Sequence, residues 1–450
     1  MKLFRYSTIL FFLLSGLVLS GCEKDTLREY NIHPYHDADY NTDDSTYTNP
    51  FIVEDYGYKH DKPTCKGMFN ALKKAFMLAQ VRWLPVGEVP SVYGSPYPAG
   101  EERTGVPYSL AQTSNTYIGL DVSLYTFLTA LHNPRSVMYT RNLRLPPYNG
   151  FDCAPYYGAV CSSSVWYALG VPAPYYTRNI RAVPHLNKMD TLTSTDVQLG
   201  DVLWSTGHVV MVFDIERDGS DSIVAVSIFE TTRTNRLDGT IRRYEFKDFQ
   251  NRWNQNNWIL YRYNDFEHNT FIADDDFIIS QGLLIPSFAY NNDICTERGD
   301  KVSYLEQDTI LINILSDSYN TIELYRNDCL YVSRTIHSQN ELFYNLPAGT
   351  YKARLSQGTQ FSGFISFEVI NANVGVSVSS KVEVQYSSSN GVPEYVEFCD
   401  REDRPEKVYI LTSEQIVRGS ISVDYSYEFC KVHFRGEYGR VCPPKIKVNQ

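Results

Sequence analysis

The pattern of apolar and polar positions changes along the chain from helical spacing to strand spacing. Between residues 64 and 83 apolar side chains recur every three or four positions, with Lys73 and Lys74 off the apolar stripe, so we predict an amphipathic helix there. Residues 121–131 form a second apolar-faced segment that ends before an Asn-Pro breaker. A third helix is expected over 161–170, because its last residue is a glycine followed closely by proline.

Strand patterns follow these helices. Residues 201–215 and 223–230 are rich in β-branched and aromatic side chains and are separated by the turn sequence ERDGSDS, which predicts a hairpin. Residues 242–246 and 258–263 add two short strands. Helices followed by an antiparallel sheet indicate an α+β domain.

The second half of the chain is predicted to be all-β. An acidic and polar stretch, 274–299, interrupts the regular pattern, and short strands separated by turns then continue to the end of the chain. This spacing is typical of β-sandwiches, and we expect two modules that meet near residues 371–375. The stretch NLPAGTYKARL at 345–355 resembles the turn and strand of immunoglobulin-like or prealbumin-like accessory domains.

The N-terminus has the features of an export signal. Basic residues at 1–5 precede an apolar run at 8–19, which is shorter than the roughly 20 residues that cross a bilayer. The ending LSGC resembles the lipobox of bacterial lipoproteins, which implies that Cys22 is lipidated and anchors the mature protein in the membrane. A plain cleaved signal with an incidental cysteine is the alternative. The polar, acidic segment 23–50 is predicted to be a tether.

Composition and cysteine spacing limit the classes of partner and cofactor that we expect. The chain of 450 residues has a formal net charge of −11 and no basic stripe, which argues against a nucleic-acid partner. No Cys/His cluster has the spacing of a zinc site, so we expect no metal and no cofactor. The grouping of Cys399, Cys430 and Cys442 favours a C-terminal disulfide in an oxidising compartment, with its connectivity open.

Three residues in the α+β part carry the chemistry of a thiol nucleophile. Cys161 opens the third predicted helix, where unpaired backbone amides favour a thiolate. His208 begins a predicted strand, and Glu230 lies at the end of the next one. If the three meet, the imidazole accepts the thiol proton and the carboxylate fixes the orientation of the imidazole.

Cys153 is a rival for the role of nucleophile. It directly follows Asp152, but the sequence Ala154-Pro155 comes next, and proline disfavours the helical conformation in the residue before it. A helix therefore cannot begin cleanly at Cys153, as it can at Cys161.

Residues 160–170 and 200–212 resemble the cysteine and histidine motifs of papain-like bacterial hydrolases of the NlpC and CHAP types. The matching features are Cys161 with a Leu-Gly helix end, and Gly-Asp followed by Gly207-His208. Many NlpC-type enzymes have aspartate directly before the cysteine, where this chain has Val160. The resemblance implies a Cys-His-Glu cell-wall amidase or endopeptidase that cleaves peptide amides of peptidoglycan, with Tyr108 and Trp204 at the oxyanion or substrate cleft.

The sequence thus predicts a papain-like α+β domain followed by all-β immunoglobulin-like sandwich modules. The predicted parts are a lipoprotein signal peptide at 1–21, an acidic tether at 22–54, the hydrolase at 55–275, a linker at 276–299, and two modules at 300–371 and 372–450. The expected location is the bacterial cell envelope, lipid-anchored in the outer membrane, with a periplasmic or a surface-exposed position left open.

Two other functions stay open at this stage. The first is a papain-like amidase, transferase or lipid-acyl enzyme with a substrate other than the cell wall. The second is an inactive surface lipoprotein whose β modules bind a glycan or a protein.

Overall fold

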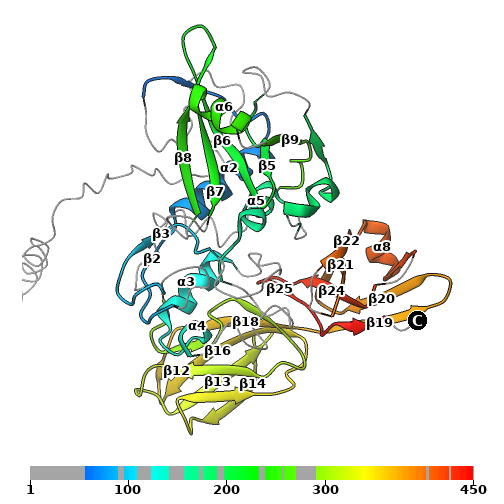
Figure 1. Cartoon of the computed structure of the whole chain (residues 1–450). Helices are drawn as coiled ribbons and strands as arrows, with labels where there is room; N and C mark the ends of the chain where they lie inside the picture. Colours follow the sequence, from blue (N-terminus) through cyan, green and yellow to red (C-terminus); the bar gives the residue numbers. More distant parts are fainter. Residues whose placement is uncertain are drawn as a thin grey trace, which may run out of the picture. The chain divides into compact units, whose positions relative to one another are not determined.

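The structure, a computed structural model, describes residues 56–89, 96–108, 123–140, 157–171, 175, 177–189, 197–232, 239–255, 258–269, 290–401, 405–424 and 427–448 (Figure 1). The predicted signal peptide, Cys22, the tether up to residue 54, and Cys153 lie outside these residues. Within the described ranges, no helix combines the length and the apolar character that a membrane span requires.

An antiparallel sheet occupies the part of the chain that was predicted to be the hydrolase. In the described residues its seven strands run in the order β4-β9-β5-β6-β7-β8, with β1 paired to β6. The strands are β1 (Lys59–His60), β4 (Leu186–Lys188), β5 (Val202–Ser205), β6 (His208–Arg217), β7 (Ile223–Thr231), β8 (Gly239–Glu245) and β9 (Ile259–Tyr263). A separate short ladder joins β2 (Arg82–Trp83) to β3 (Arg103–Thr104).

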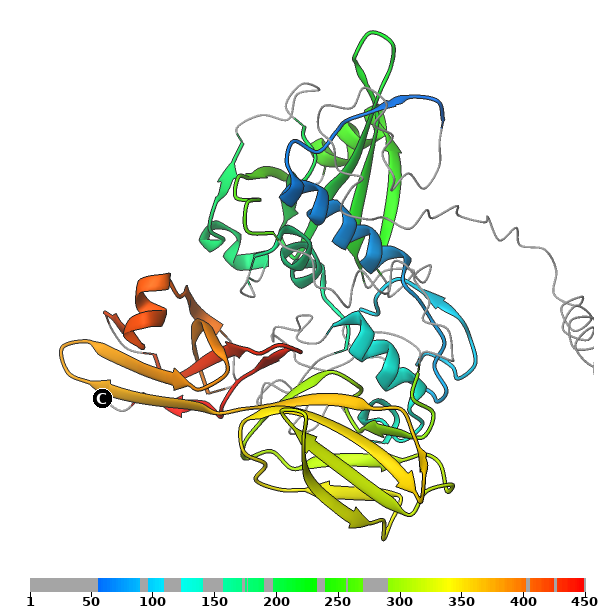
Figure 2. The ribbon, with the colours of Figure 1, turned by 180° about the vertical axis from the view of Figure 1, so that it is seen from behind.

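In the described residues, helices α2, α5 and α6 pack against this sheet. Helix α2 contacts α5, β7 and β8, and α5 contacts β6 and β7; Figure 2 shows α2 lying across the strands. The helices of this half of the chain are α2 (Lys66–Gln80), α3 (Leu124–His132), α4 (Val137–Thr140), α5 (Cys161–Leu169), the 3₁₀-helix η2 (Thr177–Ala182) and α6 (Phe246–Gln255). The sequence pattern predicted the first three long helices but not α6.

The helix predicted over 64–83 is present as α2, but much of its polar face is buried together with its apolar face. Lys73 and Lys74 are buried along with the apolar residues of the helix. The Lys74 ammonium donates to Asn269 Oδ1 over 2.6 Å, and Asn70 donates to the Asn269 carbonyl over 2.7 Å. Asn269 also donates through its side chain to the carbonyl of Ala168 in α5 over 2.8 Å. One buried amide therefore ties α2 to α5.

The segment that carries α3 makes polar contacts with the first β-module. Asn133 donates to the carbonyl of Thr296 over 3.1 Å and to Asn313 Oδ1 over 3.0 Å. Thr126 donates to the carbonyl of Lys301 over 2.7 Å. Strand β10 (Ile294–Thr296) lies inside the range predicted as a linker. Its backbone pairs with β12 (Ile310–Ile314) of the module, and it contacts α3.

The first module consists of two facing sheets. One sheet has the order β10-β12-β15 and the other β11-β18-β16-β13-β14, with β17 beside β16. Between them lies an apolar core that includes Ile312, Leu324 and Phe367. The remaining strands are β11 (Val302–Leu305), β12 (Ile310–Ile314), β13 (Thr321–Arg326), β14 (Cys329–Thr335), β15 (Asn340–Phe343), β16 (Gly349–Gln357), β17 (Gln360–Phe361) and β18 (Ile365–Ile370).

Strand β18 ends at Ile370, and the strands after it, from β19 at Ala372 onward, make up the second module. Its sheets have the orders β19-β20-β23 and β22-β21-β24-β25, with β26 beside β24. Its elements are β19 (Ala372–Val378), β20 (Val382–Ser388), β21 (Val392–Cys399), β22 (Pro405–Ile410), α8 (Ser413–Arg418), β23 (Ser420–Val423), β24 (Phe429–Arg435), β25 (Arg440–Val441) and β26 (Ile446–Lys447).

Cys430 does not form the expected C-terminal disulfide. It is a free, buried thiol in the apolar core of the second module. In the pairing of β21 with β24 it lies opposite Phe398 rather than Cys399. Neighbouring residues of a strand point to opposite faces, so the alternation of the sheet separates these two sulfurs.

The Gly-Asp turn before β5 fixes one end of the large sheet. Asp201 is 1% exposed, and its carboxylate accepts hydrogen bonds from Arg262 Nε over 2.9 Å and Nη2 over 3.0 Å. It also accepts from the backbone amide of Gln198 over 2.8 Å. Asp201 precedes β5 and Arg262 lies in β9, so this ion pair joins neighbouring strands at the base of the hairpin that carries His208.

Breaking this pair from one side should destabilise the fold. We expect Arg262→Met to lower the free energy of unfolding by about 3 kcal/mol, because it leaves a buried carboxylate without its cation. The measurement is urea unfolding at neutral pH. The double variant Asp201→Asn with Arg262→Met should regain part of the loss, and a double variant less stable than Arg262→Met would contradict the interpretation.

Candidate functional site

Cys161 is the first residue of α5 and is 6% exposed. The residue before it, Val160, has extended backbone angles, and its amide donates to Ser163 Oγ over 2.9 Å, which closes the first turn. Gly170 ends the helix in the left-handed conformation with φ of 77°, as the Leu-Gly ending predicted. Because an α-helix leaves its first amides without intrahelical acceptors, the start of α5 presents N–H donors beside the thiol.

His208 is the first residue of β6 and follows a tight turn from β5. Ser205 and His208 are directly paired, and Gly207 in the turn has φ of 93°, a conformation that side chains other than glycine rarely adopt. The glycine of the Gly-His motif therefore allows the turn that puts the imidazole at the strand end. The His208 side chain keeps 25% exposure.

Glu230 reaches the imidazole through the register of β6 and β7. Met211 pairs with Phe229, so Val210 lies opposite Glu230, and His208 is two residues further along the same face. Diagonal neighbours of this kind are within reach of long side chains. The Glu230 carboxylate is 3% exposed, and its Oε2 lies 2.8 Å from His208 Nε2.

The Cys161 thiol is the second group that acts on the His208 imidazole. With Nε2 directed at Glu230, Nδ1 is the ring nitrogen available to the sulfur. Burial lowers the pKa of His208, but the hydrogen bonds and charges of Cys161 and Glu230 outweigh it and raise that pKa to about 9. The structure thus brings together all three residues of the predicted trio.

Two residues beside the trio were missed by the sequence reasoning. Arg242 of β8 places Nη1 3.5 Å from Glu230 Oε1, with the Arg242 side chain 35% exposed. The ring of Trp258 meets the ring of His208 edge to face, with centroids 5.9 Å apart. Both contacts depend on the strand register, which no local motif encodes.

The two predicted cleft residues have different positions. Tyr108 forms a parallel bridge with Ala159, two residues before Cys161. Trp204 pairs with Val209, so alternation directs its side chain to the face opposite His208. Its indole donates to the carbonyl of Thr177 over 2.6 Å, which joins β5 to η2. The structure therefore does not bring Trp204 into the trio, and Trp258 occupies the position beside the imidazole.

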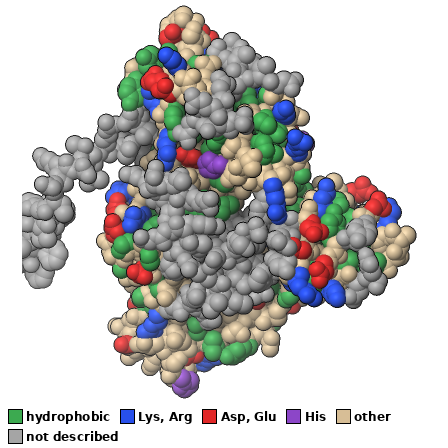
Figure 3. Space-filling model, in the orientation of Figure 1, with side chains coloured by type: hydrophobic (Ala, Val, Ile, Leu, Met, Phe, Trp, Pro, Cys, Tyr) green, Lys and Arg blue, Asp and Glu red, His purple; other side chains and the backbone are tan. Residues whose placement is uncertain are grey.

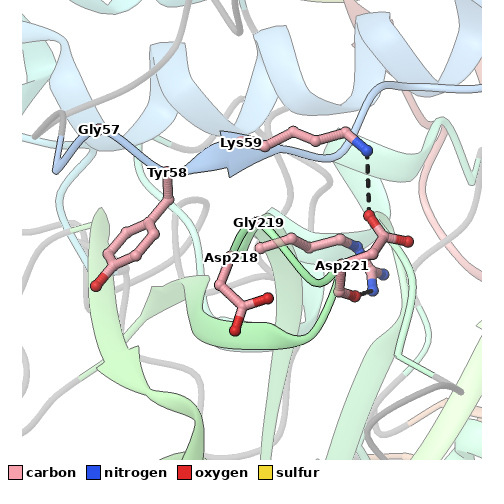
Figure 4. Close-up of a pocket in the computed structure, with 7 residues that line it drawn as sticks. Gly57, Tyr58, Lys59, Asp218, Gly219 and Asp221 are labelled. Atoms are coloured by element: carbon pink, nitrogen blue, oxygen red, sulfur yellow. Dashed lines mark hydrogen bonds and ion pairs between the residues drawn. The ribbon is translucent and has the colours of Figure 1, made fainter.

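A surface depression lies at the other end of the β6–β7 hairpin from the trio (Figure 4). The basic side chains around it, Lys59 and Arg217, are bonded to acidic ones: Lys59 lies 3.1 Å from Asp221, and Arg217 binds Asp61. On the face shown in Figure 3, acidic and basic side chains are interspersed over the described residues. Across those residues, no three His, Cys, Asp or Glu side chains gather as metal ligands would.

Comparisons with known proteins establish no family for the chain. No family model matches it, and no curated protein matches it. Among solved structures, fibronectin(III)-like modules of Clostridium thermocellum CbhA are 14% identical, with 35% of this chain and 94% of that chain covered and a TM-score of 0.19.

Two other β-sandwich structures are similar at the same level. Domains 3 and 4 of rat CD4 are 9% identical, cover 32% of this chain and 97% of their own, and have a TM-score of 0.22. The CD2-binding domain of CD58 is 8% identical, covers 33% and 96%, and has a TM-score of 0.19. Scores this low carry no functional argument, so the site rests on its geometry alone.

The contribution of Glu230 to the imidazole can be measured directly. Glu230→Gln removes the negative charge beside His208, so the pKa of His208 should fall from about 9 by about 1 unit or more. An NMR titration of the imidazole, assigned with His208→Gln, gives this value. As a control, Glu397→Gln alters a second buried pair, His433 with Glu397, and should leave the pKa of His208 unchanged. An unchanged pKa in Glu230→Gln would exclude the carboxylate as its cause.

Proposed function

We propose that the chain is an exported, lipid-anchored cysteine hydrolase that cleaves peptide amide bonds, with peptidoglycan peptides as substrate. The observation that carries this proposal is that the imidazole of His208 bonds the buried Glu230 carboxylate over 2.8 Å and has its pKa raised by both Glu230 and the Cys161 thiol at a helix start. The papain-like fold is part of the proposal. It is supported by the order of helix and hairpin and by α5 packing on β6 and β7.

The proposed reaction is acyl transfer through a thioester. His208 accepts the thiol proton, and the Cys161 sulfur attacks the carbonyl carbon of the amide. When the tetrahedral intermediate collapses, the C–N bond breaks and the imidazolium gives its proton to the leaving amine. Water activated by the imidazole then hydrolyses the thioester and frees the acid product. Glu230 stabilises the imidazolium and fixes the ring tautomer throughout.

Backbone donors would stabilise the oxyanion in this reaction. The amide of Cys161 is the first donor, because it stands at the N-terminus of α5. Tyr108 is proposed as the second donor. Its bridge to Ala159 holds its backbone beside the segment that leads into the cysteine, which supports this role.

The choice of substrate and location follows from the sequence motifs. The Gly-Asp and Gly-His motifs resemble those of NlpC-type and CHAP-type cell-wall enzymes, and the lipobox-like ending at Cys22 would place the protein in the cell envelope. The proposed partner is therefore a peptide of peptidoglycan, reached from a lipid anchor in the membrane. No cofactor enters the proposed reaction.

Digestion of purified peptidoglycan tests this function. The wild-type chain should release new amino groups, and Cys161→Ala should lower the rate at least about 1,000-fold, because the nucleophile is lost. Cys153→Ala should retain the activity. Failure of the wild type to release amino groups from several wall types would reject the cell-wall substrate, and retained activity in Cys161→Ala would reject the nucleophile.

A second candidate function is binding by the β-modules without catalysis. The observation that favours it is a set of exposed aromatic side chains on the first module. Phe361 is 48% exposed and Phe364 is 46% exposed. Both rings contact the Arg354 guanidinium, which lies 4.0 Å from the Phe361 centroid and 5.1 Å from the Phe364 centroid. Exposed apolar patches rimmed by polar groups mark interaction surfaces.

Thiol reactivity separates the two candidates. If the enzyme proposal is correct, iodoacetamide should label Cys161 near neutral pH roughly tenfold faster or more than the exposed Cys329, because His208 accepts the thiol proton. Peptide mass spectrometry of timed samples gives both rates in one protein. Labelling of Cys161 no faster than that of Cys329 would favour the binding function.

A further inference from the structure

Glu230 has a cationic or ionisable neighbour on two sides, and only one of these neighbours belongs to the proposed triad. Its Oε2 is 2.8 Å from His208 Nε2, whereas its Oε1 is 3.5 Å from Arg242 Nη1. The carboxylate lies on β7, His208 on β6 and Arg242 on β8, so the three side chains cross three neighbouring strands.

The strand register explains why Arg242 can reach the carboxylate. Thr240 of β8 lies directly opposite Glu230, and Arg242 lies opposite Ile228. Arg242 is thus two residues from the position facing Glu230 and projects from the same face of the sheet. Arg242 is therefore a diagonal neighbour of Glu230 across the β7–β8 pair. His208 is a diagonal neighbour of Glu230 across the β6–β7 pair.

Burial makes this second contact significant. Glu230 is 3% exposed, and a carboxylate removed from water needs cationic or hydrogen-bonding partners to stay ionised. An imidazole that gives up its proton during a reaction cycle is an intermittent cation. A guanidinium keeps its charge at every stage, because it is not deprotonated in proteins.

We propose that Arg242 is a positioning residue, which holds the Glu230 carboxylate against His208 while the imidazole gains and loses its proton. This inference rests on the proposed hydrolase function and assigns Arg242 no contact with the substrate. A guanidinium on one oxygen keeps the other oxygen directed at the imidazole.

The effect of Arg242→Met on the His208 imidazole tests the role, because two explanations predict opposite signs. If Arg242 positions Glu230, its loss lets the carboxylate turn away, and the pKa of His208 falls from about 9 toward its ordinary 6.5. If Arg242 is only a nearby cation, its loss removes a repulsive charge, and the pKa of His208 rises. The NMR titration of the imidazole measures this direction.

Three further measurements complete the design. Arg242→Lys keeps a cation, so the pKa of His208 should stay close to its wild-type value in this variant. Arg82→Met removes an arginine from an exposed ion pair with Glu102 and should leave the pKa of His208 unchanged. Urea unfolding must show that Arg242→Met is folded; if it is not, Arg242→Gln takes its place in the same titration.

Kinetics add a second readout. In Arg242→Met, alkylation of Cys161 by iodoacetamide should slow roughly tenfold, and if wall digestion is active, kcat should fall by a similar factor with KM unchanged. A pKa of His208 that rises or stays at its wild-type value in Arg242→Met overturns the positioning role. Because the titration needs no turnover, the inference can fail or hold independently of whether peptidoglycan is the substrate.

Discussion

The burial of one carboxylate, that of Glu230, constrains the rest of the candidate site. An ionised carboxylate at 3% exposure is stable only if nearby groups replace the water it has lost. The structure supplies an imidazole on one side and a guanidinium on the other. Both partners are placed by the same rule, since each lies two residues from the position directly opposite Glu230 on its own neighbouring strand.

The scaffold around this carboxylate holds both ends of the arrangement. The hairpin that carries His208 is fixed at its base by Asp201 and Arg262. The helix that carries Cys161 is fixed by Asn269, whose side chain reaches α5 while its carbonyl and amide oxygens bind α2. Buried polar groups with complete hydrogen bonds restrict a structure to one arrangement. Here they fix α5, which carries Cys161, and the hairpin that carries His208.

Local signals in the sequence were sufficient for the parts of the site that depend on local structure. The start of α5 at Cys161 and its end at Gly170 follow from residues adjacent to them, and the structure has both. The segment 201–215 was predicted as one strand, whereas the turn at Gly207 divides it into β5 and β6. The side of the sheet on which Trp204 lies could also have been inferred. A tight turn that pairs residue 205 with residue 208 directs residue 204 away from the imidazole.

The contacts that sequence reasoning missed depend on segments far apart in the chain. Trp258 meets His208 because β9 pairs with β5, and Arg242 meets Glu230 because of the register of β8 on β7. Likewise, the buried ammonium of Lys74 donates to Asn269, which lies almost two hundred positions later. Hydrophobic periodicity indicates which face of an element is apolar, but it does not tell which polar group from a distant segment covers the other face.

A second His–Glu pair in the chain shows that the hydrogen bond alone does not produce the properties of His208. In the second module His433 lies 3.1 Å from Glu397, yet its pKa is lowered, because burial outweighs the carboxylate and the cations Arg440 and Lys431 oppose protonation. Its ring is stacked on that of Tyr395 rather than beside a thiol. His208 differs in having 25% exposure and a sulfur partner, so its carboxylate stabilises a proton that can be exchanged. The surroundings of the pair, rather than the pair itself, thus distinguish a group suited to proton transfer from one suited to packing.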